Sequence, residues 1–96
     1  MSGGESRIQV LLPRVLLEYS NGEESVDLVA RTLAEAIEQL DARFPGLGER
    51  ILDDQGHVRR FVHVFVNQDS VGSLEPVEVQ LRSGDTVHIL PSVAGG

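Results

Sequence analysis

Residues 32–46 read TLAEAIEQLDARFPG, and this pattern predicts the main helix of the chain. Thr32 precedes Glu35 at the spacing of a capping box, in which the hydroxyl and the carboxylate satisfy backbone N–H groups that the first helical turn leaves unpaired. Apolar residues then recur on one face for about three helical turns. They are Leu33, Ile37, Leu40 and Phe44. The segment FPG ends the helix, whose apolar face must pack against another layer.

Two strands are expected before this helix. Residues 7–12 alternate in polarity and are rich in β-forming side chains, and Pro13 ends this strand. Residues 25–29 alternate again after the turn signal Asn21-Gly22. The connection between the two strands, residues 13–24, is expected to be long and irregular.

Three further strands are expected after the helix. Residues 47–59 first predict a helical turn and a surface loop. Residues 60–67, RFVHVFVN, then form the strongest strand pattern in the chain, because three valines alternate with bulkier side chains. VEVQL at residues 77–81 predicts a short strand, and TVHILP at residues 86–91 predicts the last strand, closed by proline.

This order of elements, β-β-α-β-β-β, predicts an α+β fold. A helix laid across one face of a small mixed sheet is the simplest way to bury the apolar stripe, and that arrangement is a β-grasp. We expect a mobile N-terminal segment at residues 1–6, the β-grasp domain at residues 7–91, and a flexible tail at residues 92–96 that ends in Gly95 and Gly96.

Length and charge exclude several classes of function. A chain of 96 residues forms one domain with little room for a deep active-site cleft. Its net charge of −7 opposes binding to nucleic-acid phosphates, and no basic stripe offsets that charge locally. The sequence shows neither the pattern of a signal peptide nor an apolar run near the ~20 residues that cross a bilayer. A cytoplasmic protein without nucleic-acid or membrane partners is therefore expected.

Cysteine and lysine are both missing from the chain. Without cysteine it has no disulfides, thiolate metal sites or thiol nucleophiles. All eight basic residues are arginine, so lysine is absent too. One explanation of the missing lysine is a bias in the composition of the source proteome. The other explanation is chemical and concerns the chain end.

No combination of residues points to a metal or catalytic site. The histidines His57, His63 and His88 fall in different predicted elements and lack the spacing of metal ligands. Asp53 and Asp54 lack the regular oxygen-ligand spacing of a calcium loop and are typical of a solvated turn. The sequence contains neither a nucleophile-histidine-carboxylate grouping nor a glycine-rich phosphate loop after a strand. We therefore expect a protein that is not an enzyme and binds no metal.

The strand at residues 60–67 also predicts a protein-binding face. If its valines point toward the helix, the alternating residues lie on the other side of the sheet, where so small a domain has no second layer. These candidate docking residues are Phe61, His63 and Phe65. The alternative is that residues 13–24 fold over the phenylalanines, with Leu16, Leu17 or Tyr19 as cover.

The chain end, PSVAGG at residues 91–96, predicts a tail that projects from the last strand. Glycine has no Cβ atom, so paired glycines let an extended chain pass through a narrow channel and allow close approach to the terminal carbonyl. The residues expected to enter partner active sites are Pro91, Ser92, Val93, Ala94, Gly95 and Gly96. The carboxylate of Gly96 is then the reactive group, since an activating enzyme can convert it into an electrophile.

These motifs resemble those of the ubiquitin-like sulfur carriers, the family that includes ThiS and MoaD. The likeness runs from residue 8 to residue 96 and includes LLP near the start, TLAEAIEQLDARFPGLGERILD in the middle, RFVHVFVN, and GDTVHILPSVAGG at the end. It is strongest to the CysO-type carriers, whose tail also reads proline, a variable residue and VAGG. Paired glycines are shared by all ubiquitin-like carriers, whereas the fuller tail together with RFV and FVN is more specific.

The resemblance implies a sulfur carrier and locates its chemistry. Gly96 would be the sulfur attachment point: an E1-like adenylating enzyme, similar to MoeB or ThiF, activates it with ATP, and a sulfur donor converts it into a thiocarboxylate. A partner synthase then accepts the sulfur for cysteine or another sulfur-containing metabolite, and a zinc metalloprotease is a further implied partner. The carrier itself is expected to bind no cofactor.

Other interpretations share part of this chemistry. A ubiquitin-like modifier would join Gly96 to substrate lysines, and a MoaD-like chain would be the small subunit of molybdopterin synthase. A plain interaction module would carry the glycine pair without using it. In a carrier, a nearby lysine amine or cysteine thiolate would trap the activated end. The absence of both residue types is therefore hypothesised to protect it.

Overall fold

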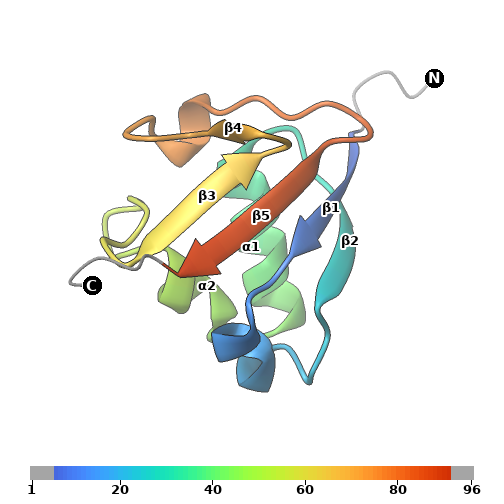
Figure 1. The fold of residues 1–96 in the computed structure, drawn as a ribbon, viewed down its shortest axis with the longest axis vertical. Coiled ribbons are helices and arrows are strands. Elements are labelled where there is room, and N and C mark those ends of the chain that lie inside the picture. The colour runs from blue at the N-terminus through green and yellow to red at the C-terminus, as the bar shows by residue number, and fades with distance from the viewer. Residues whose placement is uncertain (1–5, 92–96) are drawn as a thin grey trace.

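The computed structural model describes residues 6–91, which form a five-stranded mixed sheet with two α-helices on one face (Figure 1). In chain order the elements are β1 (Arg7–Leu11), the 3-10 helix η1 (Arg14–Tyr19), β2 (Ser25–Val29), α1 (Leu33–Arg43), α2 (Leu47–Ile51), β3 (Val62–Val66), β4 (Asp69–Ser70), the 3-10 helix η2 (Pro76–Glu78) and β5 (Thr86–Pro91). The strand order is β2-β1-β5-β3-β4. The α+β, β-grasp arrangement predicted from the sequence is confirmed. The expectations for residues 1–5 and 92–96 lie outside the described residues.

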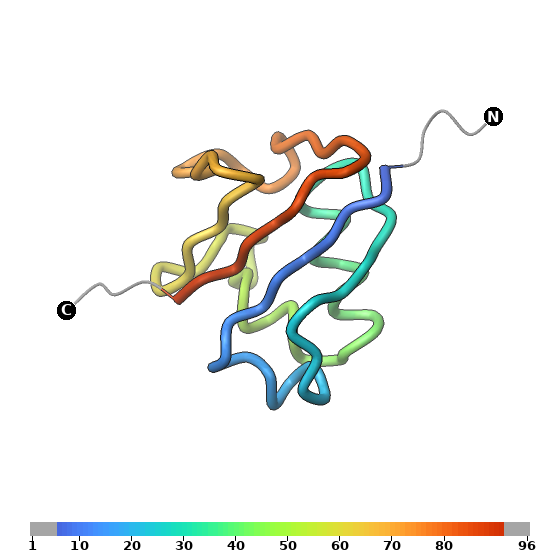
Figure 2. Tube along the Cα trace, turned by 45° about the vertical axis from the view of Figure 1, so that its right-hand side comes forward, coloured from blue at the N-terminus to red at the C-terminus, as the bar shows by residue number. Residues whose placement is uncertain are grey.

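The last strand, β5, occupies the centre of the sheet. It runs parallel to β1, with Val87 opposite Val10, and antiparallel to β3, with Ile89 opposite Val64. β1 in turn pairs antiparallel with β2. Figure 2 shows the first and last strands side by side, β1 in blue and β5 in red. Hydrogen-bonded neighbours therefore hold β5 on both of its edges.

The main helix begins as its sequence predicts and turns its apolar face to the sheet. The Thr32 hydroxyl accepts a hydrogen bond from the Glu35 N–H at 3.1 Å. The Glu35 carboxylate accepts one from the N–H of Arg31 at 2.8 Å, one residue earlier than in a standard capping box. All residues of the predicted stripe are buried: Leu33, Ile37, Leu40 and Phe44. After α1 the chain turns at Gly46, whose φ of 100° favours glycine.

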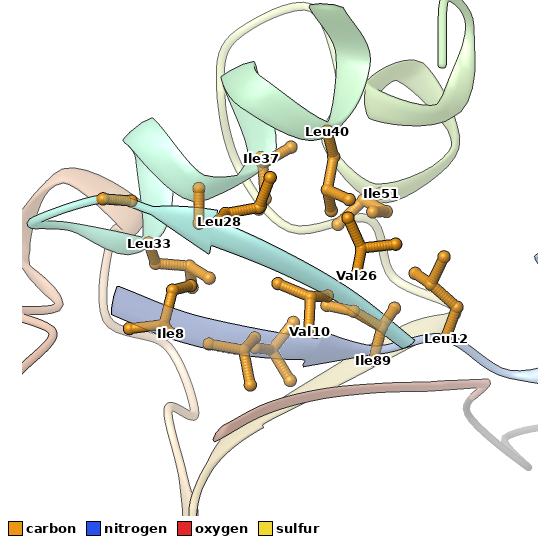
Figure 3. Close-up of a cluster of buried hydrophobic side chains, with 14 of the residues drawn as sticks. Ile8, Val10, Leu12, Val26, Leu28, Leu33, Ile37, Leu40, Ile51 and Ile89 are labelled. Carbon is orange, nitrogen blue, oxygen red and sulfur yellow. The ribbon is translucent and has the colours of Figure 1, made fainter. Parts of the chain in front are cut away.

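Side chains from the sheet and the helices meet in one hydrophobic core (Figure 3). Val10, Val26 and Ile89 come from three neighbouring strands and point toward the helical layer. Leu40 of α1 and Ile51 of α2 are fully buried against them. Burying one such side chain contributes roughly 1.5–3 kcal/mol. This core is therefore the main source of the domain's stability.

The strand predicted at residues 77–81 is wrong. Its first two residues belong to η2, a short 3-10 helix that starts at a proline. Glu75, the residue before this helix, forms a capping box with Glu78. The backbone after η2 pairs with the start of α1 and not with the sheet: the N–H of Leu33 donates a hydrogen bond to the Val79 carbonyl at 3.0 Å. Proline has no N–H for a strand ladder, and the capping bonds favour a helical turn.

Two short elements give no clear signal in the sequence. β4 has only two residues, too few for alternation to be recognised. Asn67, with a φ of 57°, lies in the tight turn before it, and Val66 pairs with Asp69 across that turn. η1 lies within the connection that was expected to be irregular. The helical turn predicted after the main helix is confirmed as α2.

Candidate functional site

β5 leads to the point where the predicted tail begins. Val87 and Ile89 on this strand are almost completely buried, whereas Leu90 and Pro91 are exposed. Pro91 still pairs with Val62 of β3 and so belongs to the sheet. The other predicted tail residues, 92–96, lie outside the described residues, so their entry into partner active sites stays a prediction. The strand that precedes them is held by the core and by both neighbouring strands.

Exposed apolar side chains surround this end of β5. Phe61, just before β3, is 65% exposed, and Val15 of η1 is 62% exposed. Leu90 is 43% exposed. Together with Tyr19 and Pro91, these side chains line a shallow cavity of about 360 Å³, which we call the tail-base cavity. Figure 1 shows the arrowhead of β5, the start of β3 and α2 at this same end of the molecule.

A second hollow, of about 370 Å³, shares Phe61 and Arg50 with the tail-base cavity. The Arg50 guanidinium lies 4.5 Å from the centroid of the Tyr19 ring. Nε of Arg59 donates a hydrogen bond to the Glu49 carbonyl at 2.6 Å. Cation–π stacking and the backbone hydrogen bond therefore position two arginines beside the exposed phenylalanine.

The three predicted docking residues do not form one surface: two lie on the open face of the sheet, and Phe61 lies at its end. His63 and Phe65 alternate with the buried Val64, so they lie on the open face of the sheet, away from the helices (Figure 1). His63 is exposed, and the half-buried Phe65 lies opposite His88 of β5. Phe61 precedes the strand and lines the two hollows at its end. Partner binding by these residues stays a prediction.

The connection at residues 13–24 does not shield Phe61. Its 3-10 helix packs at the end of the sheet instead of across the open face (Figure 1). Leu16 is buried in the core, and Leu17 and Tyr19 pack against that core. These side chains therefore leave Phe61 largely exposed.

The remaining candidate groups make local surface contacts. His57 pairs with Glu75, with 3.2 Å between Nε2 and Oε2. The Asp53 carboxylate accepts hydrogen bonds from the N–H groups of His57 and Gln55, at 3.0 and 2.9 Å, which confirms a turn and holds the pKa of this carboxyl below its usual value. Within residues 6–91, no three His, Cys, Asp or Glu side chains are grouped so as to hold a metal ion. No helix in that part of the chain is both long and apolar enough to span a membrane.

The sequence patterns miss most of the tail-base cavity. Val15 lies in a 3-10 helix inside a connection without periodicity, so nothing in the sequence indicates where its side chain points. Leu90 could have been found, because it follows the buried Ile89 in an alternating strand. Arg50 gives no signal, since its aromatic partner Tyr19 lies in a distant part of the sequence.

This geometry defines the class of protein. A mixed sheet with its last strand at the centre and a helix across one face is the β-grasp, or ubiquitin-like, domain. A chain of the Amycolatopsis orientalis BexX/CysO complex has the same fold, with a TM-score of 0.83 and 34% identity over 93% of this chain and 99% of that one.

The profile of the ThiS family matches residues 10–96, and the chain belongs to this family. The sulfur carrier protein CysO of Mycobacterium tuberculosis is 35% identical over 91 residues, which cover 93% of this chain and 98% of the relative. Small archaeal modifier protein 3 of Haloferax volcanii is 35% identical over 65 residues, which cover 68% of this chain and 70% of the relative. The resemblance inferred from the motifs is thus confirmed.

Proposed function

We propose that this protein is a sulfur carrier that acts with partner enzymes. The observation that carries the proposal is its similarity to the CysO sulfur carrier over nearly the whole chain. The family match also extends to Gly96. The position of β5 supports the proposal, because pairing with β1 at residues 86–88 and with β3 at residues 87–91 makes this strand a firm base for the residues after Pro91. The carrier needs no cofactor of its own, and the activating partner consumes ATP.

The reaction takes place at Gly96. In an E1-like enzyme, a carboxylate oxygen of Gly96 attacks the α-phosphorus of ATP, which forms an acyl adenylate and releases pyrophosphate. Hydrosulfide then attacks the acyl carbon, and AMP departs with the electron pair of the broken C–O bond. The product is a thiocarboxylate, and no oxidation or reduction is needed. A partner synthase accepts the sulfur.

Delivery of the sulfur requires direct contact with the accepting enzyme. In Amycolatopsis orientalis, CysO forms a complex with BexX, which supports binding between a carrier of this kind and another protein. For this chain, the accepting synthase makes cysteine or another sulfur-containing metabolite. Where the acceptor keeps the carrier attached as an acyl group, a zinc metalloprotease releases the product.

Intact mass measurement tests this function. The purified protein is incubated with the adenylating enzyme encoded in the same genome, ATP and sulfide. We expect the mass to rise by the difference between one sulfur and one oxygen atom, and fragmentation should locate the change at Gly96. Omission of ATP is the control and should leave the mass unchanged. No mass change in the complete reaction would contradict the proposal.

A second function, protein modification, is favoured by the similarity to a small archaeal modifier protein. It shares the activation of Gly96 and differs in the acceptor, which is a lysine of another protein. Arg82 is the last trypsin site of the chain, so a modified lysine would carry residues 83–96 after digestion. Such peptides in cell extracts would favour modification, whereas labelled sulfur that passes from the carrier into a small molecule would favour delivery.

A lysine placed beside the tail is expected to trap the activated end. Val15 is exposed and lines the same cavity as Pro91. In the variant Val15→Lys, incubated at alkaline pH with ATP and adenylating enzyme but no sulfide, the introduced amine attacks the acyl adenylate of Gly96 and forms an internal amide. The intact mass should therefore fall by one water in a large fraction of the molecules.

Val77→Lys is the matched control for this prediction. Val77 is 65% exposed, like Val15, but lies on η2 at the other end of β3 (Figure 1). We expect little internal amide in this variant. Equal fractions of amide in the two variants, or none in either, would contradict the hypothesis that the absence of lysine protects the activated chain end.

A further inference from the structure

Phe61 forms an exposed apolar ridge between two hollows beside the end of β5. It lines both hollows, and Val15 and Leu90 extend the apolar surface on the side of the tail-base cavity. Aromatic side chains of this kind are the usual anchors of protein interfaces, where a partner encloses them and excludes water. The shape therefore suits a protein surface that fits around the ring.

Arginines concentrate at this end of an otherwise acidic protein. Half of the eight arginines lie on η1, on α2 and just before β3: Arg14, Arg50, Arg59 and Arg60. The same segments hold two acidic residues, Glu18 and Glu49, so the rest of the chain has four arginines against thirteen acidic residues. Among residues 6–91, no carboxylate forms an ion pair with Arg50 or Arg59. This end therefore favours a partner surface with negative charge.

The length of the tail restricts where a partner can lie. Gly96 is five residues beyond Pro91. An extended chain covers about 3.3–3.6 Å per residue, so the two positions are separated by at most about 18 Å. An enzyme that holds Gly96 in its active site must therefore contact the surface around Pro91. The tail-base cavity and Phe61 are part of that surface.

We infer that the enzyme that activates Gly96 docks on this end of the sheet, with apolar side chains around Phe61 and carboxylates facing Arg50 and Arg59. The inference rests on the proposed function and adds the chemistry of the partner's surface to it. A second copy of the chain is a poorer occupant, because a symmetrical dimer through this end would bring its arginines together.

Steady-state kinetics of adenylation tests the inference, with the enzyme that activates the wild-type protein. Phe61→Ser and Arg50→Glu should each raise KM for the carrier about tenfold or more and leave kcat nearly unchanged, because they weaken docking without altering Gly96. The matched controls are Val77→Ser and Arg82→Glu, which change an exposed apolar residue and an exposed arginine elsewhere on the domain. Both should keep the wild-type KM.

Salt dependence separates the charge contribution from the apolar one. Higher ionic strength should raise KM for the wild type and have less effect on Arg50→Glu, since screening weakens an attraction that this variant has already lost. Thermal melting should show that all four variants are folded. An unchanged KM for Phe61→Ser and Arg50→Glu, or an equal rise in the controls, would overturn the inference and leave the proposed function intact. A wild-type chain that is not adenylated at all would overturn both.

Discussion

Replacing Gly95 with valine is expected to slow formation of the Gly96 thiocarboxylate by about a hundredfold or more. Glycine lets the chain lie extended in a narrow channel, whereas a β-branched side chain next to the reacting carbonyl needs space and restricts the backbone. A displacement of about 1 Å at the reacting carbon is enough for a loss of this size. Intact mass spectrometry over time, at fixed concentrations of adenylating enzyme, ATP and sulfide, measures the rate.

The chain contains a matched control for this substitution. Gly3 and Gly4 form a second glycine pair, far from Gly96 in the sequence. Gly4→Val introduces the same side chain and should keep the wild-type rate. If Gly95→Val reacts as fast as Gly4→Val, a narrow channel does not receive the tail, and the role proposed for the terminal glycines is wrong.

Replacing Leu40 with alanine is expected to lower the free energy of unfolding by about 3 kcal/mol, within the range of roughly 2–5 kcal/mol for truncation of a buried leucine. Leu40 has no solvent exposure, and Figure 3 shows it in the core near Val26 and Ile51. The substitution removes apolar contacts and leaves a cavity that the surrounding side chains fill only in part. Urea unfolding followed by circular dichroism measures the loss.

Glu38→Ala is the control for Leu40→Ala, because Glu38 is exposed on the same helix. This change should alter the free energy of unfolding by less than about 0.5 kcal/mol. A domain of this kind is stabilised by only about 5–15 kcal/mol, so the Leu40 variant loses a large share of its stability. A loss below about 1 kcal/mol would mean that α1 does not pack on the sheet as described.

Most of the fold could be predicted from local patterns. The two strands at residues 25–29 and 86–91 have the expected bounds, and the main helix starts after Thr32 as expected. The strand predicted at residues 77–81 is not formed, which shows the limit of predicting strands from alternating polarity. Its inward residues Val79 and Leu81 are buried as in a strand, yet their backbone pairs with the start of α1. Val77, the first residue of the same alternation, is 65% exposed on η2. Alternation therefore indicated neither the exposure of Val77 nor the backbone that supplies the hydrogen-bond partner.

The candidate site could also be predicted only in part from the sequence. The reactive role of Gly96 could be proposed from residue chemistry and family motifs, and residues 92–96 lie outside the described part of the chain. The sequence left open whether Phe61 is exposed or covered by residues 13–24, and the structure shows it exposed. Its separation from Phe65 was not expected, because β3 begins only at Val62 and Phe61 therefore does not continue the strand.

Most helix and strand positions, the capping role of Thr32 and the glycine-ended tail could be predicted without a structure. They depend on neighbours in the sequence or on the chemistry of single residues. The approach of Val15 and Phe61 to Leu90 and Pro91 depends on tertiary structure. These residues lie far apart in the chain and meet because β5 inserts between β1 and β3, while η1 and α2 pack at the end where β5 stops. Such long-range pairing leaves no local pattern in the sequence, so only the structure shows that these side chains form one surface.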